Sequence, residues 1–260
     1  MAVPQPKTFT GGAIMISMGF ANIPRDDKVA DGGDDAWFIT NSVTSAFAVA
    51  DGVGSWRAKG INAGECSRQI MKFCKDYFVD GGTVPITALE NAEELSNMAG
   101  STTALVAYYD MGLKVLDVVQ VGDSNLIVIR DNYVAHQTES QVRSHNTPYQ
   151  IGAGSNDTVE YHSRGYAFEL QEGDIIVAGS DGLWDNMFPT QIIELIRGSG
   201  LRSAKQLSRI IASVAYELSH DTNMWSPFAQ DAYEDHKVQN TDNWKGGKQD
   251  DITVVVAVVS

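Results

Sequence analysis

The sequence has few basic residues, only two cysteines and no long hydrophobic run. Lysine and arginine number 19 against 33 aspartates and glutamates, which gives a net charge of −14 at pH 7. This negative charge repels a nucleic-acid backbone or an anionic membrane surface, so neither is an expected partner. No apolar run reaches the ~18–20 residues that a membrane-spanning helix needs. Metal cations and basic peptides are the partners that the composition favours.

Cys66 and Cys74 are expected to be free thiols. The residues between them show a helical pattern, in which eight positions at ~1.5 Å each correspond to about 12 Å. That separation exceeds the ~7 Å limit between Cα atoms of a disulfide, so a reducing compartment is indicated. The first 25 residues contain only Lys7 and Arg25 as basic residues, and no targeting segment is visible. Cytoplasm and mitochondrion both remain open.

The chain of 260 residues has no repeat and no low-complexity linker, so residues 1–260 are expected to form a single domain. Runs rich in β-branched residues predict eight strands, at about residues 13–20, 36–40, 45–50, 102–109, 113–121, 125–130, 174–179 and 252–259. Turn residues at 122–124 join two of these strands and predict an antiparallel hairpin.

Helical periodicity is clearest over residues 204–218, where Ser203 and Gln206 predict a capping box. Further helices are predicted at about residues 62–79, 85–99 and 189–198. Strands and helices come in clusters and not in strict alternation, which favours an α+β fold. Residues 220–249 show no clear periodicity and are long for a structureless loop, so they are a candidate functional flap over a substrate site.

Several aspartates lie where an apolar strand begins or ends, next to residues that allow tight turns. They occur in GGDDAWF, AVADGVGSW, QVGDSNLIV, IIVAGSDGLWD and GGKQDDITVVVAVV. Each Asp-Gly pair alone is ordinary turn chemistry. Lysine and arginine are too sparse nearby to pair with all of these carboxylates, and hard oxygen donors suit Mg²⁺ or Mn²⁺. Five such sites in one acidic chain therefore indicate a metal centre.

These segments, together with GSTTALV, resemble the ordered motif series of the metal-dependent 2C-type serine/threonine protein phosphatases, the PPM family. They span residues 33–256 in that family's order. The stretches NTPYQIG, SPFAQDA and GGKQDD resemble its mitochondrial and chloroplast subgroup. The resemblance implies an α+β fold with a four-layer α-β-β-α sandwich, in which helices flank two central antiparallel sheets. It also implies a phosphoprotein substrate, and we expect a monomer.

The resemblance assigns roles around two divalent cations, Mn²⁺ or Mg²⁺. Asp51 would bridge the two ions, and the carbonyl of Gly52 would bind one of them. Asp34 takes the place of a metal-binding glutamate, and Asp35 takes that of an aspartate that orients metal-bound water. Two such cations activate a bridging water and offset the charge of the phosphoryl oxygens. The expected reaction is therefore direct attack of metal-bound hydroxide on phosphoserine or phosphothreonine, without a phosphoenzyme.

Other aspartates complete the implied metal centre. Asp181 and Asp250 would complete the shell of the second ion. Asp123 and Asp181, helped by Asp185, resemble the family's weaker third-metal position. Asp251, which stands where many members have asparagine, is an additional candidate residue of the metal site.

The sequence departs from the family at its usual proton donor. Many members have histidine directly after the Asp-Gly of the bridging motif, where this chain has Val53. Valine cannot donate a proton to the leaving alkoxide. Water on a metal, or a histidine such as His145, is a candidate replacement.

A second departure concerns the grip on the substrate phosphate. Better-known members have arginine four residues before the first metal acid, where this chain has Ala30. Three nearby basic residues are candidates to replace it, although each also fits a solvated surface charge: Arg25, Lys28 and Arg57.

Other functional classes fit the sequence less well. A haloacid-dehalogenase-type phosphatase would need Asp-x-Asp after its first strand, and the stretch that begins at Asp51, Asp-Gly-Val-Gly, lacks the second aspartate. Neither an EF-hand loop nor a P-loop is present in the sequence. The alternative that remains is a catalytically weak pseudophosphatase that acts as a metal- and phosphoprotein-binding module. Retention of all the principal metal acids favours the enzyme.

Overall fold

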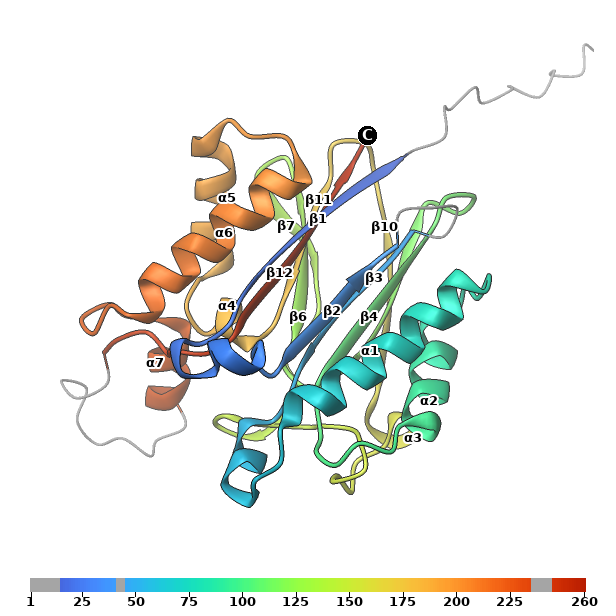
Figure 1. Cartoon of the computed structure of the whole chain (residues 1–260). Helices are drawn as coiled ribbons and strands as arrows, with labels where there is room; N and C mark the ends of the chain where they lie inside the picture. Colours follow the sequence, from blue (N-terminus) through green and yellow to red (C-terminus); the bar gives the residue numbers. More distant parts are fainter. Residues whose placement is uncertain (1–14, 41–44, 235–244) are drawn as a thin grey trace, which may run out of the picture.

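The computed structural model describes residues 15–40, 45–234 and 245–260, and its centre is a pair of five-stranded antiparallel sheets (Figure 1). One sheet has the order β1 (Ile16–Ile23), β12 (Ile252–Val259), β11 (Ile175–Gly179), β6 (Asn125–Arg130) and β7 (Tyr133–Gln137). The other has the order β10 (Arg164–Glu169), β5 (Val115–Val121), β4 (Ala104–Asp110), β3 (Ser45–Asp51) and β2 (Asp35–Ile39). A small hairpin joins β8 (Val142–Ser144) to β9 (Thr147–Pro148).

Helices cover the outer face of each sheet (Figure 1). Helices α1 (Ala63–Val79) and α2 (Pro85–Leu95) cover the sheet whose edge strands are β2 and β10. Helices α5 (Pro189–Ser199) and α6 (Ala204–Ser219) cover the sheet whose edge strands are β1 and β7. The predicted four-layer sandwich is therefore confirmed. Shorter helices are η1 (Asp26–Asp31), η2 (Gly54–Lys59), α3 (Val159–His162), α4 (Asp181–Trp184) and α7 (Pro227–Glu234). Within the described ranges, no helix is both long and apolar enough to cross a bilayer.

The strands are apolar on both faces because both faces are buried. In β3, Phe47 and Val49 pack between the two sheets, whereas Ala46, Ala48 and Ala50 face the α1–α2 layer. Strand β12 divides its residues in the same way between the sheet interface and the α5–α6 layer. Successive side chains of a strand point to opposite faces, so a continuous apolar run is what a strand between two layers requires.

The predicted hairpin between residues 113–121 and 125–130 is wrong. Strand β5 pairs with β4 and β10, whereas β6 pairs with β11 and β7, so the short link crosses from one sheet to the other. The amide of Gln120 donates to the carbonyls of Gly122 and Ser124, at 3.2 and 2.9 Å, and so stabilises this crossing. Because both strands are buried on both faces, their pattern does not distinguish a hairpin from a link between facing sheets.

Local details differ from the sequence predictions in two further places. In the described chain the side chain of Ser203 makes no capping hydrogen bond, so the predicted capping box at α6 is wrong. Part of the segment 220–249 is helical, as α7, and residues 235–244 lie outside the described residues. The expectation of two free cysteines is confirmed, since Cys66 and Cys74 are both buried and unpaired in the described structure.

Candidate functional site

The strand-end aspartates meet at one end of the two sheets. Asp35 begins β2 and lies opposite Asp51, which ends β3. Asp123 lies in the link from β5 to β6, Asp181 follows β11, and Asp250 precedes β12. Antiparallel pairing brings the start of one strand beside the end of its neighbour, so these aspartates lie at the same end of the strands.

Asp51 is at the electrostatic centre of this group. Burial raises the pKa of its carboxyl well above the usual value, and the charges of Asp181, Asp35 and Asp250 raise it further. The pKa of Asp35 is raised for the same reason, first by burial and then by neighbouring negative charge. The carboxylates of this site therefore carry more negative charge than the neighbouring basic side chains offset.

The two remaining acids of the expected third-metal position lie beside Asp181. Burial raises the pKa of Asp123, and the charges of Asp181 and Asp185 add to the shift. Burial likewise raises the pKa of Asp185, to about 7, although the ammonium of Lys248 opposes the shift. Asp123, Asp181 and Asp185 therefore lie close enough for their charges to shift one another's pKa values.

Lys248 is a functional neighbour that the sequence reasoning missed. Its Nζ contacts Oδ2 of Asp181, lies 2.7 Å from Oδ2 of Asp185 and is 3.4 Å from Oδ2 of Asp250. Burial alone would raise the pKa of Asp181, yet the charge of Lys248, hydrogen bonding and the charge of Lys28 together outweigh burial, so this pKa lies below its usual value. The stretch GGKQDD placed a lysine two residues before Asp250, and that spacing was the available signal.

The donor set fits divalent cations. Among the described residues, Oδ1 of Asp35, Asp123 and Asp181 is buried without a hydrogen-bond partner, and we call these three atoms the open oxygens. Buried carboxylate oxygens are costly without a partner, and they are the ligands that Mg²⁺ and Mn²⁺ prefer. As they stand, no three His, Cys, Asp or Glu side chains of the described chain are arranged around one point so as to hold an ion. Binding of a cation would therefore require these side chains to move.

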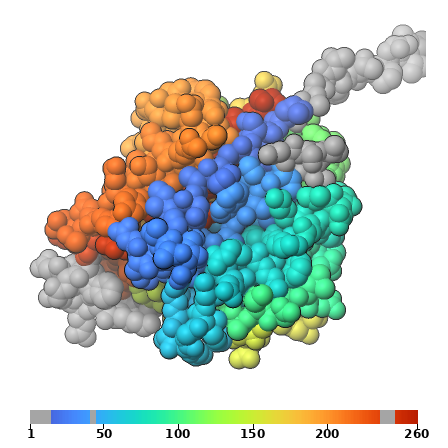
Figure 2. Space-filling model, viewed as in Figure 1, coloured from blue at the N-terminus to red at the C-terminus, as the bar shows by residue number. Residues whose placement is uncertain are grey.

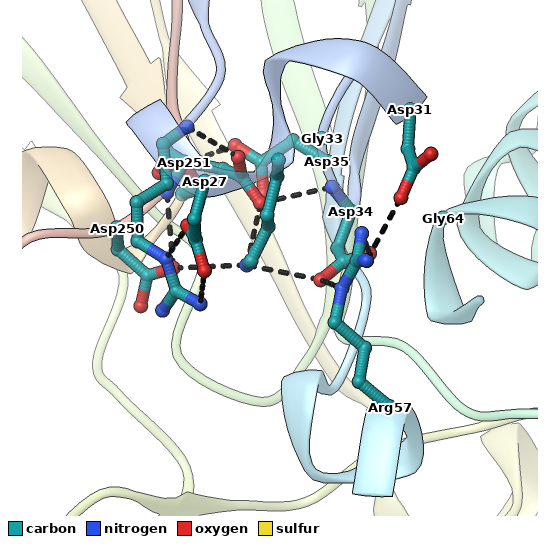
Figure 3. Close-up of polar contacts among 12 residues, drawn as sticks. Asp27, Asp31, Gly33, Asp34, Asp35, Arg57, Gly64, Asp250 and Asp251 are labelled. Carbon is teal, nitrogen blue, oxygen red and sulfur yellow. Dashed lines mark hydrogen bonds and ion pairs between the residues drawn. The ribbon is translucent and has the colours of Figure 1, made fainter. Parts of the chain in front are cut away.

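Asp34 points to a different set of partners (Figure 3). The guanidinium of Arg57 grips it with two hydrogen bonds, of 3.0 Å to Oδ2 and 2.8 Å to Oδ1. The ammonium of Lys28 lies 2.9 Å from its Oδ2 and 2.8 Å from Oδ2 of Asp251. We call Lys28, Asp34, Arg57 and Asp251 the ionic hub. It adjoins the Asp51 group, since Nζ of Lys28 also lies 3.4 Å from Oδ1 of Asp250.

The ionic hub joins three parts of the chain. Lys28 is the buried residue of η1, with 2% exposure, and η1 lies at the surface between α6 and the η2–α1 segment (Figure 2). The carboxylate of Asp251 accepts from the backbone N–H groups of Arg25 and Asp34, at 2.7 and 2.8 Å. Two of the three expected phosphate-binding residues, Lys28 and Arg57, are thus occupied by carboxylates. Arg25 pairs with the exposed Asp27, at 2.6 Å.

Gly52 is required by close packing of the main chain. Its N–H donates to the carbonyl of Asp34, at 3.1 Å. A Cβ at this position would lie 2.6 Å from that carbonyl oxygen and 2.8 Å from the carbonyl oxygen of Ala63. Any side chain would push β3 away from the start of α1 and would move Asp51 with it.

A cavity of about 390 Å³ opens beside the carboxylates. Asp123, Asp181 and Asp185 line it on one side. The other side is formed by the β8–β9 hairpin and α7, with the ring of His145 4.7 Å from that of Phe228. A histidine thus lies at the same cavity as the expected metal acids.

Known proteins are similar to this chain in sequence and in fold. The family model described as stage II sporulation protein E (SpoIIE) matches residues 42–260. The human protein phosphatase PTC7 homolog is 33% identical over 96% of this chain and 88% of its own length. The chain belongs to the protein phosphatase 2C family. The rice protein called probable protein phosphatase 2C 71 is also 33% identical, over 95% of this chain, which spans only 52% of that relative's length.

Solved structures of phosphatases have the same fold as this chain. The structure of the photosystem II phosphatase PBCP has a TM-score of 0.89 at 31% identity, and covers 95% of this chain and 99% of its own. The catalytic domain of the serine/threonine protein phosphatase PstP, in complex with two manganese ions, has a TM-score of 0.65 at 18% identity, with coverage of 95% and 99%. The second likeness concerns the fold alone.

The raised pKa values of this protein phosphatase 2C member predict how its metal-free stability depends on pH. A carboxyl with a raised pKa binds its proton more tightly in the folded chain, so stability falls as pH rises from the unfolded pKa, about 3.9, to the folded one. For Asp185 that window ends near pH 7, because its folded pKa is about 7. Asp34 and Asp181, whose pKa values are lowered, contribute in the opposite direction only below about pH 4.

We therefore expect the melting temperature in EDTA to decrease between about pH 5 and pH 7.5, by calorimetry. Excess Mn²⁺ should remove most of the decrease, and Asp185→Asn should flatten the profile in EDTA. A melting temperature that rises over this range in EDTA would contradict the electrostatic description of the site.

Proposed function

We propose that this chain is a metal-dependent protein serine/threonine phosphatase that hydrolyses phosphoserine and phosphothreonine with two divalent cations. The observation that carries the proposal is the set of strand-end carboxylates around Asp51, with open oxygens, in a protein phosphatase 2C sandwich. Residues 1–260 would act as one catalytic domain. Neither the family nor the carboxylates suggest binding of nucleic acid, and we keep a monomer as the working assumption.

We assign the ion-holding residues as follows. Asp51 and the carbonyl of Gly52 would hold the first cation, and Asp51 with Asp181 and Asp250 the second. Mn²⁺ or Mg²⁺, when bound, supplies Lewis acidity that activates water and offsets charge on the phosphoryl oxygens. Asp34 stays a candidate ligand, although it would have to release Arg57 or Lys28 to reach an ion.

Asp35 is suited to orient the attacking water. The hydroxyl of Ser180 donates to its Oδ2, at 2.7 Å, which fixes the carboxylate and leaves Oδ1, one of the open oxygens, without a hydrogen-bond partner. Its raised pKa makes it a stronger proton acceptor than an ordinary aspartate. Ser101 and Thr102 are fully buried and hydrogen-bonded, so neither is available as a nucleophile. This arrangement supports direct attack by water, without a phosphoenzyme.

Phosphate release from a phosphothreonine peptide tests the proposal. We expect release with Mn²⁺ or Mg²⁺, none in EDTA, and recovery when metal is restored. Acid-quenched reactions with ³²P-labelled peptide should leave no label on the protein. Binding of the phosphopeptide without release under any divalent cation would favour the pseudophosphatase alternative.

His145 is our candidate for the proton donor that Val53 cannot supply. It lines the cavity beside Asp123, Asp181 and Asp185. His145→Gln should lower kcat about 10²-fold for phosphothreonine peptides, whose leaving alkoxide needs a proton. It should change kcat little for p-nitrophenyl phosphate, whose phenolate leaves unprotonated.

His220→Gln is the matched control, since this histidine follows α6 and pairs with Asp26. Equal losses of kcat on both substrates in the His145 variant would assign His145 to packing of the cavity wall.

Helix α7, which lies within the predicted flap at residues 220–249, supplies the proposed substrate surface. Asp231 and Glu234 of α7 line the cavity that holds the site carboxylates. Asp231→Asn combined with Glu234→Gln should lower kcat/KM about fivefold to tenfold for peptides with arginine or lysine near the phosphoresidue, because exposed charge pairs contribute up to ~1 kcal/mol each. Peptides with neutral flanks should be affected less than about twofold.

The control is Glu172→Gln, an exposed acid in the turn from β10 to β11, at the opposite end of the sheets. If the double variant loses activity equally on basic and neutral peptides, α7 does not select basic substrates.

A further inference from the structure

The side chain of Lys248 occupies the place where the family resemblance puts a third metal. Its ammonium contacts Oδ2 of Asp181 and lies 2.7 Å from Oδ2 of Asp185, two of the three acids expected there. It also lies 3.4 Å from Oδ2 of Asp250. The side chain is only 14% exposed, and its Nζ lies 5.5 Å from the centre of the Phe228 ring.

The main chain around Lys248 is fixed in position. The buried amide of Asn186 accepts from the N–H of Lys248 and donates to its carbonyl, both at 2.9 Å. The same amide donates to the carbonyl of Gly182, next to Asp181, at 2.8 Å. A Cβ on Gly247 would lie 2.2 Å from the carbonyl oxygen of Leu218. Lys248 is therefore delivered to the carboxylates by a packed backbone, and is not a surface lysine that happens to reach them.

We propose that Lys248 is a built-in cation that replaces the third metal ion. This inference rests on the proposed metal centre. An ammonium at hydrogen-bond distance from Asp181 and Asp185 offsets their charge and fills the space that an ion would need. The chain then requires two exchangeable divalent cations, held around Asp51, and excludes a third from the Asp185 side. Lys248 is a positioning residue, because it acts through Asp181 and Asp250.

The test is a count of bound Mn²⁺ on the full chain, by the EPR signal of free Mn²⁺ during titration. Wild-type protein should bind two equivalents. Lys248→Met should bind a third equivalent over a range of Mn²⁺ concentration in which the wild type binds only two. Asp185→Asn in the Lys248→Met background should remove the third equivalent. Lys245→Met, an exposed lysine three residues earlier, is the matched control and should bind two.

Each outcome decides the matter. Two equivalents in both wild type and Lys248→Met would overturn the inference and leave the proposed function intact. A third equivalent in the wild type that Asp185→Asn removes would also overturn it. No binding to any variant would overturn the proposed metal centre, and the inference with it. If Lys248→Met fails to fold by circular dichroism, the neutral donor variant Lys248→Gln and the wild-type count decide.

Discussion

Asp51→Asn should abolish phosphate release by this chain, with a loss of about 10³-fold or more in kcat. Asp51 is the carboxylate whose pKa the charges of Asp181, Asp35 and Asp250 all raise, and it is the proposed ligand of both cations. An amide keeps the shape of the side chain and removes its charge, so the several kcal/mol that a bound metal contributes to the transition state are lost. Steady-state release from a phosphothreonine peptide in saturating Mn²⁺ measures the effect.

Stability separates this loss from unfolding. Ionised Asp51 opposes folding at neutral pH, as its raised pKa shows. In EDTA at pH 7.5 the melting temperature of Asp51→Asn should therefore equal or exceed that of the wild type, and Mn²⁺ should no longer raise it. Asp76→Asn, at an exposed pair on α1, is the control and should retain activity. Substantial turnover by Asp51→Asn would remove Asp51 from the centre of the mechanism.

Lys28→Met should destabilise the folded chain by about 3–5 kcal/mol, the usual cost of breaking a buried ion pair from one side. The substitution would leave the carboxylates of Asp34 and Asp251 facing each other, each already 0–1% exposed at the side chain. Asp250, 3.4 Å from the same ammonium, would lose a neighbour too. The melting temperature should fall by on the order of 10 °C for a chain of this size.

Lys75→Met is the matched control for Lys28, because Lys75 is exposed on α1 and its removal should change stability by less than about 0.5 kcal/mol. Chemical denaturation followed by tryptophan fluorescence gives both free energies of unfolding. If Lys28→Met matches the control, the ionic hub does not hold η1, β2 and β12 together, and Lys28 is again free to be a phosphate ligand.

Local patterns of apolar and polar residues, each within a single strand or helix, predicted most of the fold. The apolar runs at β3 and β12 and the periodicity of α6 depend on neighbours a few residues away, so the sequence alone places them well. The link at residues 122–124 was not predicted correctly from the local sequence. Whether β5 and β6 pair with each other depends on which sheets the rest of the chain forms. Strand β7, with alternating half-buried residues, carries little apolar signal and was not predicted.

The site shows the same division. Aspartates next to strand ends identified the Asp51 group, since strand ends of a sandwich converge. The role of Lys28 depends on Asp251, which lies 223 positions away in the sequence, and no local pattern indicates that contact. Asp34 lies in the bend just before β2, and its partners Lys28 and Arg57 come from η1 and η2, so no pattern around Asp34 indicates the ionic hub.

The most direct measurement is an anomalous difference map from crystals of the full chain soaked in Mn²⁺. We expect two peaks within ligand distance of Asp51, with the carbonyl of Gly52 at one and Asp181 and Asp250 at the other. The Asp185 side should show the ammonium of Lys248 and no peak. Absence of any peak near Asp51 under conditions that support phosphate release would contradict the account.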